Sequence, residues 1–171
     1  MIVPNLRLGA VWTDLQEADL QSDFFFKAGG DGVALPIRGY EDASVEACNG
    51  SESKGRGGYC ADVFPPGLNA TDTFAIANRV GGRAMMLGGV ETRFPTFALE
   101  DFWFAAFFDF GAIAPTWREM TSDRFKTSVG GGLRWLLSGQ IPLRLDLAYP
   151  LNPTYFSEQT LRVHLNIFYT L

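Results

Sequence analysis

Alternation of apolar with polar or small side chains, sustained over about ten residues at a time, is the feature that most constrains the fold of this chain. In segment 160–171, Arg162, His164 and Asn166 share one parity, whereas the residues between and after them are largely apolar. Successive side chains of a β-strand point to opposite faces, so this segment is a strand with one apolar face. Soluble strands are typically only about 5–6 residues long. Alternation over about 9–11 residues instead predicts a strand that crosses a membrane.

The same alternation predicts further strands along the chain, and we expect strands at residues 5–12, 83–94, 102–114, 125–135, 143–151 and 160–171. The expected fold is all-β, a transmembrane antiparallel β-barrel portion of about six or seven strands. Its apolar faces would contact lipid and its polar faces the lumen. A soluble β-sandwich or lipocalin-like binder is the alternative, and it would bury the apolar faces instead.

Segment 102–114 shows which face should look inward. Asp109 shares a parity with Phe107 and Gly111, while a row of phenylalanines that includes Phe104 and Phe108 has the opposite parity. An unpaired carboxylate against lipid is costly, so we expect Asp109 inside and this row outside. By the same parity, Glu91, Arg144, Asp146 and the single histidine, His164, are expected to face the lumen.

The connections differ greatly in length. Short turn signals occur at 138–140 and 152–154, whereas residues of about 37–80 form one long loop rich in glycine. Cys48 and Cys60 lie in this loop, and in an exported protein they suggest a disulfide. Two free thiols are the alternative. The chain has no second pair of cysteines, and no histidine lies near these two in the sequence, so we expect no metal site.

Composition excludes several classes of function. The net charge of -5 gives no sign of the basic surface that a nucleic-acid-binding protein needs. Neither a run of about 20 apolar residues nor a signal peptide is visible. The glycines at 130–132 lack the lysine of a phosphate loop, and nothing beside His164 resembles a nucleophile elbow, so we expect no cofactor and no catalytic residue.

Four motifs, in order, resemble the end of the Omp85 superfamily barrel, a family that includes BamA- and TamA-like assembly factors and bacterial surface antigens. Residues 25–32 and 37–40 resemble its FxAGG…VRGY segment, and 107–111 its F-x-D-x-G strand motif. Residues 130–135 and 142–150 resemble its penultimate strand pair. Tyr169 and Leu171 occupy outward positions of a C-terminal β-signal, although Asn166 stands where glycine is usual and Leu171 where Phe or Trp is usual.

The resemblance implies a role for the long loop. Arg38, followed by Gly39 and Tyr40, would reach into the lumen and pair with Asp109 and Glu91 as a loop latch. The alternative is a solvated Arg38 beside an unrelated lumen carboxylate. The family resemblance covers nearly the whole of residues 1–171, without POTRA domains. Closed barrels have at least about 8 strands, so we expect a fragment, or a barrel that another chain completes.

The function implied is that of a non-enzymatic insertase or translocon in the bacterial outer membrane. Such proteins act by strand pairing and membrane thinning. The expected partners are the lipid bilayer, nascent outer-membrane proteins and the lipoproteins of the assembly machinery. Two alternatives stay open: the C-terminal membrane barrel of a patatin-like phospholipase, and a two-partner secretion transporter.

Overall fold

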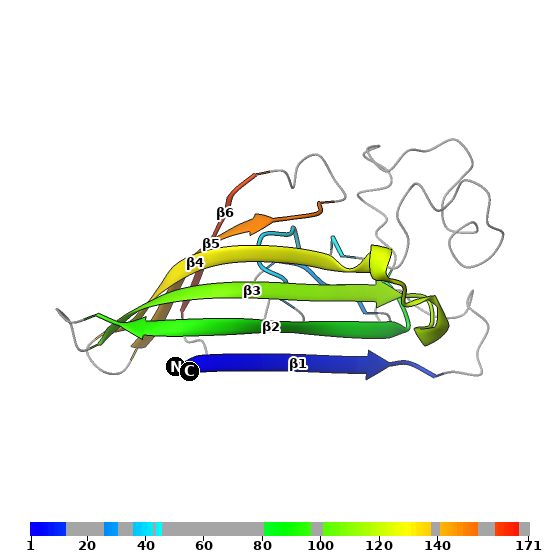
Figure 1. Ribbon diagram of the computed structural model, residues 1–171, viewed down its shortest axis with the longest axis horizontal. Helices are drawn as coiled ribbons and strands as arrows, with labels where there is room; N and C mark the ends of the chain where they lie inside the picture. Colours follow the sequence, from blue (N-terminus) through cyan, green and yellow to red (C-terminus); the bar gives the residue numbers. More distant parts are fainter. Residues whose placement is uncertain are drawn as a thin grey trace.

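One antiparallel sheet of six strands, side by side in chain order, forms the framework of the molecule (Figure 1). The computed structural model describes residues 1–12, 26–30, 36–42, 44–45, 81–96, 101–137, 141–153 and 160–167. The strands are β1 (Ile2–Ala10), β2 (Ala84–Pro95), β3 (Phe102–Ala114), β4 (Lys126–Leu137), β5 (Ile141–Pro150) and β6 (Arg162–Ile167). The all-β antiparallel prediction is therefore confirmed.

Two short 3-10 helices, η3 (Trp117–Glu119) and η4 (Ser122–Arg124), lie in the connection between β3 and β4. Within the part of the chain that the structure describes, no helix has the length and apolar character needed to cross a membrane.

Strand limits follow the alternation closely. The predicted strand at 102–114 coincides with β3, and β2, β4 and β5 differ from the prediction by one or two residues at each end. The first strand is Ile2–Ala10 rather than 5–12, and Ile2 pairs with Thr92. The last strand is described only to Ile167, so its predicted end at 168–171 lies outside the described residues.

The two faces of the sheet separate apolar from charged side chains as the parity predicted. On β3, Phe104 is 53% exposed and Phe108 40% exposed, whereas Asp109 is only 6% exposed. Exposed apolar side chains share the outward face across the sheet: Leu6, Val90, Phe94, Phe104, Phe108, Val129, Trp135, Leu145, Leu147, Val163 and Leu165. The core therefore lies on the opposite face, and the outward face has the character expected for contact with lipid.

The inward face is covered by the segment that includes Arg38, drawn in cyan on the side toward which β5 and β6 turn (Figure 1). Backbone bridges join Ala28 to Val45 and Gly30 to Ile37. The side chains of Ala28, Ile37, Tyr40 and Val45 are at most 1% exposed. These few residues thus pack as part of the core, while residues 46–80, with Cys48 and Cys60, lie outside the described residues.

Candidate loop latch

Arg38 and Asp109 form a buried ion pair between the long loop and β3. Arg38 Nε donates to Asp109 Oδ2 at 2.6 Å, and Nη2 donates to Oδ1 at 2.7 Å. The backbone N–H of Arg38 also points to Oδ2, at 3.4 Å. The two side chains are only 7% and 8% exposed. Two parallel donors from one planar guanidinium fix the orientation of both groups, which a single point charge would not do.

The same guanidinium reaches two further strands. Arg38 Nη1 donates to Glu91 Oε2 on β2 at 2.9 Å and to Asp146 Oδ2 on β5 at 3.1 Å. Its central carbon lies 3.4 Å from the centroid of the Phe107 ring, which stacks beneath the cation. One loop side chain therefore contacts three strands of the sheet.

The charge of Arg38 is secured by these contacts. Burial by itself lowers the pKa of the Arg38 guanidinium, but hydrogen bonds and charge from Asp109, with smaller effects of Asp146 and Glu91, outweigh it. The pKa of Arg38 is therefore raised above its ordinary value. Arg38 stays a cation at any pH at which the protein is folded.

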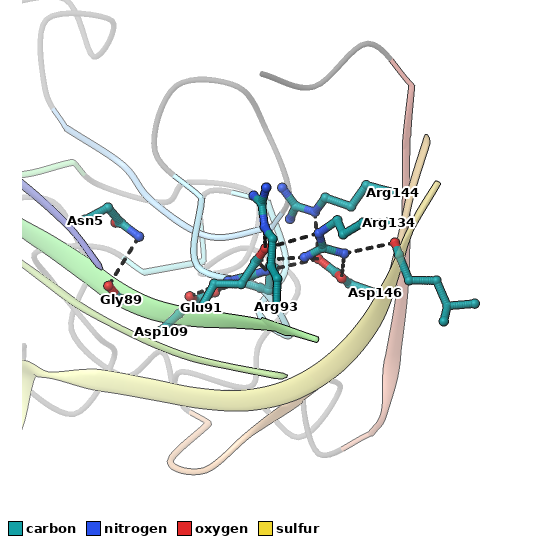
Figure 2. A network of polar contacts seen from close by, with 10 residues as sticks. Asn5, Gly89, Glu91, Arg93, Asp109, Arg134, Arg144 and Asp146 are labelled. Atoms are coloured by element: carbon teal, nitrogen blue, oxygen red, sulfur yellow. Dashed lines mark hydrogen bonds and ion pairs between the residues drawn. The ribbon is translucent and has the colours of Figure 1, made fainter. Parts of the chain in front are cut away.

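Arg134 on β4 joins the carboxylates from the other side. Its side chain is 1% exposed and bonds Glu91 Oε2 at 2.7 Å and Asp146 Oδ1 at 2.5 Å. Arg93 Nε adds a bond to Glu91 at 2.8 Å, and Arg144 Nε adds one to Asp146 at 2.6 Å. Figure 2 shows these side chains converging from β2, β4 and β5 on one cluster.

The strands contribute equal numbers of positive and negative groups to this cluster. Three guanidinium groups of the strands, those of Arg93, Arg134 and Arg144, stand against the three carboxylates of Glu91, Asp109 and Asp146. Arg38 adds a fourth cation from the loop. Without Arg38, the named charges that the strands contribute therefore sum to zero.

Gly39 and Tyr40 extend the contacts of Arg38 along the loop. Gly39 has a φ of 91°, a left-handed conformation that favours glycine, and a Cβ there would crowd the backbone of Pro150. Its N–H donates to His164 Nε2 at 3.0 Å. Tyr40 is buried, and its hydroxyl lies 3.0 Å from the Thr127 carbonyl oxygen and 2.9 Å from Asn152 Oδ1.

Asn152 ties two connections of the sheet together. Its Oδ1 also accepts the backbone N–H of Thr127 at 2.8 Å, and its Nδ2 donates to the Phe125 carbonyl at 2.5 Å. Tyr40 therefore docks on a side chain that already fixes the start of β4 to the end of β5.

Small residues make room for the loop. A Cβ at Gly111, two residues beyond Asp109 on β3, would collide with Ile37 and Leu87. The F-x-D-x-G spacing therefore places an aromatic ring, a carboxylate and a gap on successive inward positions of one strand. Each of these three positions meets the segment around Arg38.

The structure brings together Arg38, Gly39, Tyr40, Glu91, Asp109, Phe107 and Gly111, all of which the sequence singled out. Asn166 lies on β6 opposite Arg144 of the neighbouring strand. Tyr169 and Leu171, like Cys48 and Cys60, lie outside the described residues.

Four contributors were not singled out from the sequence: Arg93, Arg134, Asn152 and Arg162, which pairs with Glu41 at 2.8 Å. For the three arginines, the inward parity of their strand positions was the available signal. The partners of Arg134 depend on how β2, β4 and β5 are aligned, which no local pattern gives.

The ion pairs of this arrangement can hold the loop segment against the sheet. Each carboxylate of the cluster is bonded to at least one guanidinium. In the described part of the chain, no group of three His, Cys, Asp or Glu side chains is arranged to hold a metal ion.

Comparison with models of known protein families identifies a family for this chain. The model of the Omp85 superfamily domain matches residues 4–168, which include part or all of every described strand and the segment with Arg38. A comparison with curated proteins found no match.

Proposed function

The chain belongs to the Omp85 superfamily, whose members insert or transport proteins at outer membranes, and on that premise we propose that it is part of a BamA- or TamA-like assembly barrel. It would reside in the bacterial outer membrane and act without making or breaking covalent bonds. Its partners would be the lipid bilayer, nascent outer-membrane proteins and lipoproteins of the assembly machinery. Residues 1–171 would be one part of the barrel domain, closed by further strands of the same protein or of another chain.

The single observation that carries this proposal is the Arg38 to Asp109 fork between the loop and the inward face of β3. A buried pair of this kind holds the loop in one place, because removing either partner leaves a charge without compensation. We take the pair, with Glu91, as a loop latch that keeps the segment docked on the sheet.

The alternation of connection lengths supports an orientation in the membrane. The connections at 96–101 and 138–140 are short and lie at one end of the sheet, whereas those at 11–83, 115–125 and 151–161 lie at the other. Outer-membrane barrels place short turns on the periplasmic side and long loops outside. The latch segment would therefore enter the lumen from the outer surface.

The proposed function is tested by reconstitution of the full-length protein into lipid vesicles. We expect it to accelerate the folding of an added, urea-unfolded outer-membrane barrel relative to empty vesicles. Release of fatty acids from the lipid, without such acceleration, would favour the phospholipase alternative. Transport of an unfolded secreted substrate into the vesicles, without acceleration, would favour the secretion transporter.

The latch is tested separately with Arg38→Ala. We expect faster protease cleavage within the long loop, because the loop loses its bonds to Asp109, Glu91 and Asp146. Arg118→Ala, a change at an exposed residue of η3, is the matched control. Unchanged protease resistance in Arg38→Ala would remove the basis for the latch.

A further inference from the structure

Gly39 and Glu41, which follow Arg38 in the loop, contact β6 rather than the carboxylate cluster. The Gly39 N–H donates to His164 Nε2 at 3.0 Å, and Arg162 Nη2 pairs with Glu41 Oε1 at 2.8 Å. His164 and Arg162 are alternate residues of β6, so both side chains lie on its inward face. The loop therefore meets β6 at two successive inward positions.

β6 is the end strand of the described sheet. It pairs with β5 on one side, and among the described strands none lies on its other side. The outer N–H and C=O groups of a strand in that position can pair with a further strand, such as one that would close the barrel. The contacts of His164 and Arg162 thus act on the last strand of the described sheet.

We infer that Gly39, Glu41, His164 and Arg162 form a clasp that couples the docking of the loop to the position of β6, the last strand of the described sheet. His164 and Arg162 are positioning residues in this clasp. The clasp does not rest on the proposed function.

The coupling follows from the short length of chain between the two sets of contacts. Arg38, which binds β2, β3 and β5, directly precedes Gly39 and lies three residues before Glu41. Gly39 has a left-handed φ of 91°, and in this turn its N–H meets β6 while the Arg38 side chain meets the cluster. A movement that withdraws Arg38 must therefore also displace the Gly39 and Glu41 contacts.

The nature of each contact determines the useful variants. His164 Nε2 accepts a hydrogen bond here, so His164→Gln can present an oxygen acceptor in its place, whereas His164→Leu cannot. The Glu41 to Arg162 pair is about a quarter exposed on each side, so Arg162→Met should have a modest effect. The double change Glu41→Arg with Arg162→Glu restores the pair with its charges exchanged.

The experiment is amide hydrogen exchange on the full-length protein in lipid vesicles, read by mass spectrometry. For His164→Leu we expect exchange of the β6 amides, residues 162–167, to accelerate by about fivefold, as loss of one hydrogen bond implies. For Arg162→Met we expect about twofold to fivefold. Exchange in β3 should not change, and His164→Gln, the charge exchange and the surface control Arg118→Met should resemble the wild type.

Unchanged β6 exchange in both single variants would overturn the clasp, and so would an equal acceleration in β3, which would indicate general destabilisation. If His164→Leu does not fold, the comparison of Arg162→Met with the charge exchange decides. The proposed function is judged by a different readout. A clasp that behaves as expected in a protein that accelerates no barrel folding would leave the clasp standing and the proposed function refuted.

Discussion

Among the described residues, the Asp109 carboxylate accepts hydrogen bonds from Arg38 alone. Glu91 and Asp146 differ, because each also bonds Arg134 and one further arginine of its own strand. The three carboxylates therefore depend on the loop to different degrees. Of the three, Asp109 alone would lose its guanidinium partner if the loop undocked.

Asp109→Asn should loosen the loop without loosening the sheet. The variant keeps the size of the side chain but removes the charge that Arg38 grips, a loss of about 1.5–3 kcal/mol for hydrogen bonds between charged groups. We expect faster protease cleavage near residues 26–45 and little change in the circular dichroism of the strands. Asp101→Asn, at an exposed position, is the control. Cleavage at the wild-type rate would show that Asp109 does not hold the loop.

Arg134→Met should affect the whole sheet more than Asp109→Asn does. Arg134 is 1% exposed and bonds both Glu91 and Asp146, so its loss leaves buried carboxylates undercompensated. We expect a cost of about 3–5 kcal/mol in the free energy of unfolding. The measurement is urea unfolding in vesicles, with Arg118→Met as control. A midpoint at or above that of Asp109→Asn would contradict the central place given to Arg134.

Asn152→Ala should be more damaging than Tyr40→Phe. Tyr40→Phe removes one hydroxyl from Asn152 and Thr127, which should cost about 1 kcal/mol. Asn152→Ala also leaves the Thr127 N–H and the Phe125 carbonyl without their partner. We expect its unfolding free energy to fall by about twice as much, measured by the same urea titration. Equal effects would mean that Asn152 serves only the loop and not the sheet.

The sequence predicted the fold well because strand alternation is a local property. The parity of 102–114 placed Asp109 inward and Phe104 outward, and the structure has them so. Strand ends were less accurate at 5–12, since the pairing of Ile2 with Thr92, which no local signal marks, extends β1 toward the N-terminus.

The site was only partly accessible to sequence reasoning, because its contacts join residues far apart in the chain. Parity put Glu91 and Asp146 on the inward face, but not beside Arg134, since that depends on the alignment of three strands. The sequence around Asn152 indicated only a turn. The contact of His164 with Gly39 depends on the path of the loop, which the sequence pattern does not give. Local patterns give the face of a side chain, whereas register and loop path give its partner.

Phe104→Arg tests whether the outward face contacts lipid. Phe104 is 53% exposed and lies among other apolar outward residues, so in a membrane its replacement by a cation would meet hydrocarbon. An arginine on the lipid face of a barrel costs about 2–4 kcal/mol near the bilayer midplane and less toward the interfaces. We therefore expect the free energy of folding into vesicles to fall measurably for Phe104→Arg and only slightly for Phe104→Leu, the matched control. In a water-exposed sheet the arginine would instead be harmless or improve solubility, so a Phe104→Arg protein as stable as Phe104→Leu would contradict the membrane placement of β3.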